Sequence, residues 1–254
     1  MKRELILIML AIWLIAPNAS AQQRTEVSLT KGWKFTRQDN PASYEAEYDD
    51  SSWQSVTIPH DWAIYGPFDK SNDIHRMAIV QDGQTTAIEH YGRTGGLPFT
   101  GAGWYRYKFS VPNMSDNKKV NIKFDGAMSN ARVYVNGKEV GFWPNGYNTF
   151  HFDITDFVKK DGTENTLAVR LENFDEQSRW YPGAGLYRNV HLITTAETHI
   201  PIWGTYITTP VVTDEFAKVN IKTKLEAKAG NNYKLITEIK DNEQNTVAVS
   251  ESEL

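Results

Sequence analysis

Short runs of alternating apolar and polar residues recur along much of the chain. In one of them Val120, Ile122 and Phe124 are separated by Asn121 and Lys123. Successive side chains of a β-strand point to opposite faces, so this period of two predicts antiparallel strands with one buried face. Similar runs span residues 105–111, 131–135 and 167–171.

Turn residues separate these runs, and no window shows a sustained helical period. Asn136-Gly137 lies between two apolar runs and is the strongest short signal for a β-hairpin. The one helical candidate, at 154–158, is a single turn long. We therefore expect an all-β fold with about ten strands between residues 24 and 198, for which a jelly-roll β-sandwich is the natural closure.

The strand pattern restarts after residue 198. Four short strands are predicted there, at 203–209, 217–225, 233–239 and 246–250. This stretch holds roughly 55 residues, whereas an immunoglobulin-type sandwich needs about 100 residues and seven strands. We expect a jelly-roll domain at 22–198 followed by a partial, truncated immunoglobulin-like domain at 199–254.

The first residues have the features of a secretory signal peptide. Lys2 and Arg3 precede an apolar run at 5–16, and Ala19-Ser20-Ala21 follows it. A basic start, an apolar core and small residues at the end predict cleavage after Ala21. The run is shorter than the roughly 20 residues that a membrane-spanning helix needs, and no later segment is long and apolar enough to span a bilayer. We expect residues 1–21 to be removed and the protein to be periplasmic or secreted.

Composition narrows the possible classes. The chain has 254 residues, is 40% hydrophobic and carries a net charge of −4, which argues against disorder and against a nucleic-acid partner. It has no cysteine, so disulfides, thiolate nucleophiles and cysteine metal sites are excluded, and a bacterial periplasm is favoured over a eukaryotic secreted domain. Eight Trp, twelve Tyr and eleven Phe suit either a large β core or a surface that stacks on sugars.

Two segments depart from the regular strand pattern and are candidate ligand loops. Residues 62–103 contain no confident strand, and loops of that length are usually functional or disordered. Residues 173–185 are the second such segment. The densest motif, at 178–188, reads S-R-W-Y-P-G-A-G-L-Y-R, where arginine and aromatic side chains could form a stacking and hydrogen-bonding surface for a pyranose. The alternative is a purely structural loop, with Trp180 in the core and Arg188 paired with an acid.

Three other groups of residues are candidates for catalysis or metal binding. His60 and Asp61 could form a base and its orienter, but neighbours in an extended chain point to opposite sides, so a turn with Trp62 packed beneath it is the favoured interpretation. Asp175 and Glu176 are paired acids, yet a chance pair is easily found among so many carboxylates, and we do not assign them as catalysts. The histidines do not pair at metal-ligand spacing, so we expect neither a metal nor a cofactor.

Taken together, several segments resemble the amino-terminal sugar-binding domain of glycoside hydrolase family 2, of the β-galactosidase kind. Their order and spacing, ending in R-W-Y-P-G-A-G, are more specific than any one of them. Members of that family have a jelly-roll domain, then an immunoglobulin-like domain, then a TIM barrel that holds both catalytic glutamates. The segments are 58–68, 103–109, 124–137, 141–150, 153–155, 165–169 and 179–190.

The resemblance implies a role in sugar binding for two loops. Loops of the first domain in related galactosidases reach the sugar pocket, which points to Ser178, Arg179 and Trp180, and more loosely to Tyr91 and Arg93. A well-known bacterial relative has an acid near the position of Ser178, so a contact there is the weakest of these assignments. A TIM barrel needs about 250 residues, none of which are present, so no catalytic residue is carried over and the chain alone is expected to be inactive.

Two functions remain open from the sequence. The first is the non-catalytic sugar-binding portion of a retaining β-glycosidase, truncated before its barrel; the second is a free-standing, lectin-like carbohydrate-binding module. The unfinished second sandwich favours the first. The expected partner is a β-linked oligosaccharide or glycoside, with galactosides favoured over glucuronides and mannosides, and the oligomeric state is left open.

The export signal makes a direct prediction. We expect the mature protein to begin at Gln22, because cleavage follows Ala21. Amino-terminal sequencing of the protein recovered from its native host measures this, and a soluble form that keeps residues 1–21 would contradict it.

Overall fold

The computed structural model describes residues 24–74, 83, 85–88, 96–111, 118–174 and 183–254. In this part of the chain nearly all regular structure is β. The helical element found there, η1 (Lys70–Asn72), is one short 3-10 turn within the long loop. The predicted turn at 154–158 is present as a turn and not as a helix.

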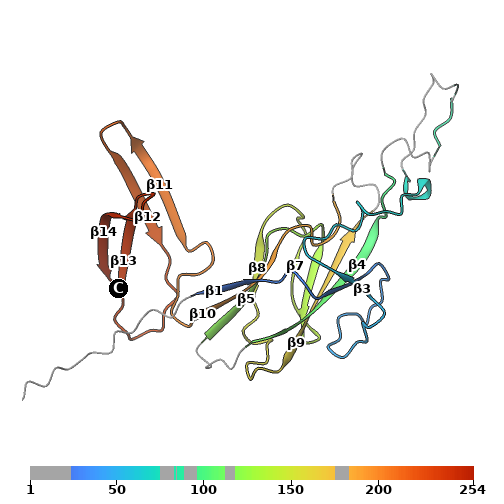
Figure 1. Cartoon of the computed structure of the whole chain (residues 1–254), viewed down its shortest axis with the longest axis horizontal. Helices are drawn as coiled ribbons and strands as arrows, with labels where there is room; N and C mark the ends of the chain where they lie inside the picture. Colours follow the sequence, from blue (N-terminus) through green and yellow to red (C-terminus); the bar gives the residue numbers. More distant parts are fainter. Residues whose placement is uncertain (1–23, 75–82, 84, 89–95, 112–117, 175–182) are drawn as a thin grey trace, which may run out of the picture.

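Ten strands between residues 25 and 196 form two facing antiparallel sheets (Figure 1), as expected from the sequence. The four-stranded sheet has the order β1-β10-β5-β8, and the six-stranded sheet has the order β3-β2-β4-β9-β6-β7. The strands are β1 (Thr25–Ser28), β2 (Trp33–Thr36), β3 (Gln54–Val56), β4 (Gly101–Ser110), β5 (Lys118–Phe124), β6 (Ala131–Val135), β7 (Lys138–Trp143), β8 (Phe150–Asp153), β9 (Glu164–Asn173) and β10 (Val190–Ala196).

The hairpin between β6 and β7 turns at the dipeptide that the sequence singled out. Asn136 and Gly137 have φ values of 50° and 78°. A two-residue turn with positive φ at both positions matches the twist of the strands it joins, which explains the preference for Asn-Gly.

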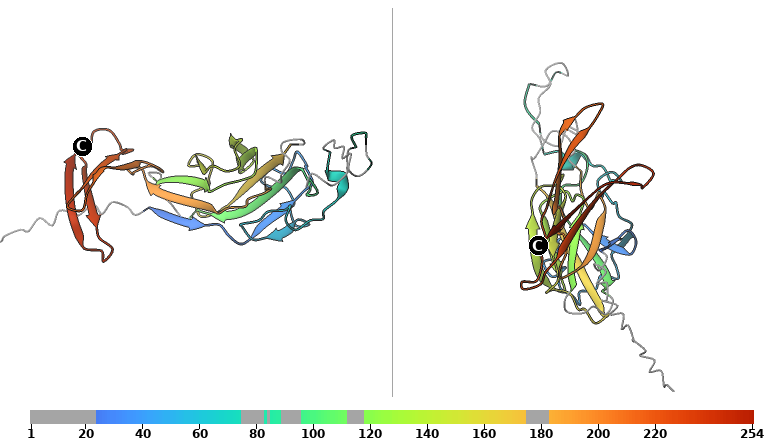
Figure 2. Two further views of the ribbon diagram at one scale, coloured as in Figure 1. Left: turned by 90° about the horizontal axis from the view of Figure 1, so that it is seen from above. Right: turned by 90° about the vertical axis from the view of Figure 1, so that its left-hand side faces the viewer.

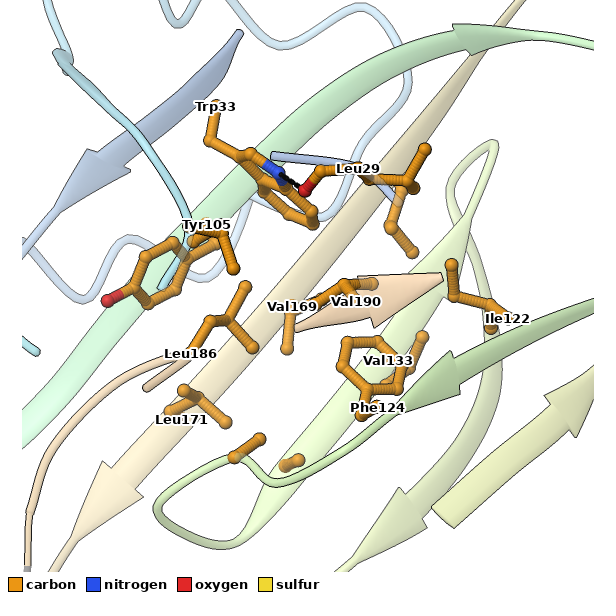
Figure 3. Close-up of a cluster of buried hydrophobic side chains, with 14 of the residues drawn as sticks. Leu29, Trp33, Tyr105, Ile122, Phe124, Val133, Val169, Leu171, Leu186 and Val190 are labelled. Carbon is orange, nitrogen blue, oxygen red and sulfur yellow. Dashed lines mark hydrogen bonds between the residues drawn. The ribbon is translucent and has the colours of Figure 1, made fainter. Parts of the chain in front are cut away.

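The core lies between the two sheets (Figure 3). Trp33 and Tyr105 of the six-stranded sheet are fully buried, as are Phe124 and Val190 on the opposite side. The indole nitrogen of Trp33 donates to the carbonyl of Leu29 at 2.8 Å, so its polar atom has a partner inside the core. Complete burial of a Phe or Val side chain contributes about 1.5–3 kcal/mol, so this layer supplies much of the stability of the sandwich.

The outer face of the six-stranded sheet is also covered, which the one-sided strand pattern did not predict. Trp104 and Ala168 point to that face and are buried beneath the segment 37–53, which contributes Trp53. Three half-buried tyrosines, Tyr44, Tyr48 and Tyr134, complete this second apolar cluster.

Arg106 of β4 fastens this covering segment to the sheet. Its side chain is only 1% exposed, and its Nε donates to Asp50 Oδ2 at 2.8 Å. Nη1 donates to the carbonyls of Ser43 and Glu45 at 2.7 and 2.8 Å, and Nη2 donates to two further carbonyls of the same segment. A buried guanidinium is tolerated only when its donors are satisfied, and here Nε, Nη1 and Nη2 all bind this one segment.

The remaining four strands form two separate hairpins. β11 (Thr205–Val212) pairs with β12 (Ala217–Thr223), and β13 (Lys234–Lys240) pairs with β14 (Thr246–Glu253). Their positions agree with the four predicted strands. The hairpins lie at the end of the molecule opposite η1 and the long loop, as Figure 2 shows. No helix of the described part of the chain is long and apolar enough to cross a membrane.

The buried guanidinium predicts a large stability effect. Replacement of Arg106 by Met should lower the free energy of unfolding by about 3–5 kcal/mol, because Asp50 and several carbonyls lose their partner. Urea denaturation measures the loss. Arg132→Ala is the matched control, since that arginine pairs with Glu139 in an ion pair whose side chains are both 45% exposed; it should cost less than about 1 kcal/mol. Equal losses in the two variants would show that Arg106 does not fasten the segment.

Candidate functional site

The loop residues that the sequence singled out lie outside the described part of the chain. This applies to Ser178, Arg179 and Trp180, to Tyr91 and Arg93, and to the acidic pair Asp175 and Glu176. The residues on either side of the 175–182 loop are described. We use the term frame for residues 184–186, the two chain segments that pair with them, and Asn173.

One side of the frame is a short segment, 184–186, that pairs with the chain around His60. The His60 amide donates to the carbonyl of Leu186 at 2.8 Å, and the Trp62 amide donates to the carbonyl of Ala184 at 3.1 Å. These bonds have the spacing of an antiparallel ladder, in which alternate residues exchange bonds. The segment that follows the 175–182 loop is therefore fixed to the start of the long loop.

The other edge of the same segment pairs with the chain around Met128. The Met128 amide donates to the Gly185 carbonyl at 3.0 Å, and the Gly185 amide donates to the Met128 carbonyl at 2.9 Å. Residues 184–186 therefore run between two chain segments far apart in sequence, with hydrogen bonds on both edges. Backbone groups paired in this way are held in one place, as in the interior of a sheet.

Gly185 is required at its position by the close approach of two neighbours. Its φ is 116°, a conformation that residues with a side chain rarely adopt. A Cβ atom there would lie 2.5 Å from both the His60 carbonyl oxygen and Tyr105 Oη. The second glycine of the P-G-A-G stretch thus allows the backbone to pass between these groups.

Asn173 joins the two ends of the loop. It is the last residue of β9 and is buried. Its Nδ2 donates to the carbonyl of Gly183 at 2.9 Å, and its Oδ1 accepts from Ser129 Oγ at 3.2 Å. The side-chain amide of Asn173 therefore connects the end of β9 to Gly183, which follows the loop, and to Ser129. The sequence placed Asn173 at the start of the candidate segment 173–185 but assigned it no role, because its bonds to Gly183 and Ser129 are tertiary contacts.

His60 and Tyr105 form a buried polar pair under the frame. His60 Nδ1 and Tyr105 Oη are 2.7 Å apart, and both side chains are buried. Burial lowers the pKa of the His60 imidazole and raises the pKa of the Tyr105 hydroxyl well above its usual value. The pair is therefore a neutral imidazole beside a neutral hydroxyl, and Tyr105 Oη also donates to the carbonyl of His60 at 3.4 Å. Both rings pack against Phe35 of the core, with centroids 4.8 Å from its ring.

Asp61 adopts the turn that the sequence analysis favoured. Its Oδ1 accepts from the Ala63 amide at 3.0 Å, and Trp62 beside it is buried. A Cβ atom on Gly183 would lie 3.7 Å from Asp61 Oδ2, so this carboxylate faces the end of the 175–182 loop. The side chain of His60 contacts Phe35 and Tyr105, so the two neighbouring side chains lie in different surroundings.

The alternative role of Arg188 as half of an ion pair receives no support from the contacts described. Its guanidinium lies over the ring of Tyr187 at 5.4 Å, and its Nη1 donates to the backbone carbonyl of Asp125 at 3.4 Å. Among the described residues no group of three His, Cys, Asp or Glu side chains could hold a metal ion.

The sequence is similar to a known family model and to several curated proteins. Residues 27–196 match the family model described as the sugar binding domain of glycosyl hydrolases family 2. A curated relative, the beta-galactosidase BoGH2A of Bacteroides ovatus, is 36% identical over 223 residues, which cover 87% of this chain and 24% of that protein. A beta-glucuronidase of Formosa agariphila is 28% identical, over 91% of this chain and 24% of its own length.

Solved structures give the same result for the fold. A glycosyl hydrolase family 2 member from Bacteroides cellulosilyticus superposes with a TM-score of 0.76 at 33% identity, covering 90% of this chain and 29% of that one. A beta-glycosidase from Bacteroides vulgatus has a TM-score of 0.74 at 29% identity, covering 91% and 28%. The chain thus spans about a quarter of the length of the curated relatives described above.

The buried His60 makes stability depend on pH. Its pKa in the folded protein is lowered from 6.5 by burial, so below that pH the unfolded chain binds more protons than the folded one. Its contribution to stability is therefore complete above about pH 6.5 and is lost as the pH falls below it. In His60→Gln, which keeps a neutral hydrogen-bonding side chain beside Tyr105, the free energy of unfolding should fall less steeply between about pH 7 and pH 5. Urea denaturation across this range measures it, and identical slopes for both proteins would refute the assignment.

Proposed function

The chain belongs to glycoside hydrolase family 2, and from that premise we propose that it forms the non-catalytic sugar-binding portion of a retaining β-glycosidase. The ligand is a β-linked glycoside, with a β-galactoside favoured over a β-glucuronide. Its contacts are Ser178, Arg179 and Trp180 of one loop, and Tyr91 and Arg93 of the other. No catalytic residue is assigned to this chain.

The observation that carries the proposal is the frame around the 175–182 loop. Residues 184–186 are hydrogen-bonded on both edges, and the side chain of Asn173, at the end of β9, donates to the carbonyl of Gly183. A loop whose two ends are fixed loses less conformational entropy when it binds a ligand, so a fixed frame favours binding at this loop. Arg179 supplies donors for sugar hydroxyl groups from this fixed base, and Asp61 faces the same loop end.

The second candidate, a free-standing lectin-like module, is distinguished by where an open aromatic surface lies. A module that binds a glycan on the face of its sheet needs accessible rings on that face. On the outer face of the six-stranded sheet, Trp104 is buried beneath the segment that Arg106 fastens. This supports sugar contact at the loop end of the sandwich over contact on the face of that sheet.

We also propose that the protein is exported, with its mature chain in the periplasm or outside the cell. The basic start, the apolar run at 5–16 and Ala19-Ser20-Ala21 support this. The amino-terminal sequencing described above tests it.

Two substitutions separate ligand contact from structure within the loop. Arg179→Ala should weaken lactose binding by about tenfold or more, since a charge-assisted hydrogen bond is worth about 1.5–3 kcal/mol, and should change the free energy of unfolding by less than about 0.5 kcal/mol. We expect Trp180 to act mainly in packing under the 183–185 turn, with Arg179 as the principal ligand contact, so Trp180→Ala should cost about 3–5 kcal/mol of stability.

Isothermal titration calorimetry with lactose and urea denaturation measure these two effects on the full chain. Arg132→Ala, on an exposed ion pair of β6, is the matched arginine control for both. Unchanged lactose affinity in Arg179→Ala, or a larger stability loss there than in Trp180→Ala, would reverse the assigned roles. Absence of any lactose binding by the wild-type chain would contradict the proposed function itself.

A further inference from the structure

A shallow pocket lies beside the frame, along the free edge of the six-stranded sheet. It has a volume of about 350 Å³ and is lined by residues 54–60 and Tyr65. Ligand pockets commonly have volumes of about 300–1,000 Å³, so this one has room for a sugar ring with part of its neighbour. β3, which supplies three of its lining residues, lies at the end of the strand order and pairs with β2 in the described part of the chain (Figure 1).

Tyr65 presents an accessible aromatic face at this pocket. Its side chain is 74% exposed, and its ring stacks on His60 with centroids 6.0 Å apart and an interplanar angle of 20°. His60 in turn packs against Phe35 at 4.8 Å and bonds to Tyr105, both in the core. A column of rings therefore supports the exposed tyrosine from the core outward, and such support keeps an aromatic face in one orientation.

The other groups of the pocket suit hydroxyl recognition. Gln54, Ser55 and Thr57 are exposed and supply one amide and two hydroxyl groups. Ser55 Oγ accepts from Lys34 Nζ at 3.1 Å, which leaves its own hydrogen to donate outward. Lys34 is not itself a lining residue, and the described residues that line the pocket include no carboxylate, lysine or arginine. The imidazole of His60 is kept neutral at pH 7, because burial lowers its pKa.

We propose that this pocket is a second sugar subsite, in which a neutral pyranose of a β-linked oligosaccharide stacks on Tyr65 and hydrogen-bonds to Gln54, Ser55 and Thr57. A pyranose has an apolar C–H face, which matches the negative face of an aromatic ring, and a rim of hydroxyl groups, which matches neutral donors and acceptors. The inference rests on the proposed sugar-binding function. It extends that function from one loop to a neighbouring surface, since His60 borders both the pocket and the frame.

Amide chemical shifts of the full ¹⁵N-labelled chain, titrated with lactose, test the proposal residue by residue. We expect the amides of residues 54–57 and Tyr65 to shift in the wild type. In Tyr65→Ala these shifts should require about fivefold to tenfold more lactose, whereas Tyr65→Phe, which keeps the ring, should behave as the wild type. Because Tyr65 is exposed, neither substitution is expected to unfold the protein.

Arg179→Ala separates the two sites. That variant should lose shifts around the 175–182 loop and keep those at residues 54–57, so a failure of the loop site does not imitate a failure of the Tyr65 subsite. The subsite is refuted if residues 54–57 do not shift at lactose concentrations that saturate the loop, or if Tyr65→Ala leaves their titration unchanged. Methyl β-D-glucuronide shifting the same amides with equal affinity would overturn the assignment to a neutral sugar.

Discussion

The main-chain pairing of residues 184–186 on both edges is the constraint on which the loop end of the sandwich depends. On one edge the segment bonds to the chain at His60 and Trp62, and on the other it bonds to Met128. It brings together three parts of the chain that are each more than fifty residues apart, and it does so through backbone groups that cannot be left unpaired when buried. The candidate sugar loop lies between Asn173 of this frame and Gly183. The neighbouring Tyr65 pocket adjoins the frame at His60.

Arg106 imposes a second constraint, because the segment it binds covers the outer face of the six-stranded sheet and keeps that face from contacting a ligand. Its guanidinium bonds to the segment that covers Trp104 and Trp53, so an aromatic cluster that could otherwise meet a glycan belongs to the interior. The alternation that makes β4 resemble an ordinary half-exposed strand conceals this, since both of its faces are buried over much of its length. Binding is thereby directed to the end of the sandwich and away from the face of the six-stranded sheet.

Local features could be predicted from the sequence, and non-local ones could not. The strand positions, the Asn136-Gly137 hairpin and the turn at Asp61 each depend on a few neighbouring residues, and the structure confirms all of them. The second apolar cluster, the role of Asn173 and the stacking of Tyr65 on His60 depend on segments distant in sequence, for which the alternation pattern holds no information. Gly185 could be predicted in part. The P-G-A-G stretch indicated an unusual backbone conformation, but the reason a glycine is needed, the close approach of His60 and Tyr105, is a tertiary contact.

Native-state hydrogen exchange of the Gly185 amide tests the central claim most directly, because it reports whether the frame is as fixed as the strands that surround it. Gly185 donates to the Met128 carbonyl, and the Val169 amide in the middle of β9 is a suitable reference. The account predicts that the Gly185 amide is protected to within about tenfold of Val169, opening only with the sandwich as a whole. Exchange as fast as that of an unstructured loop would show that the segment opens locally, and would contradict a fixed frame beside the sugar loop.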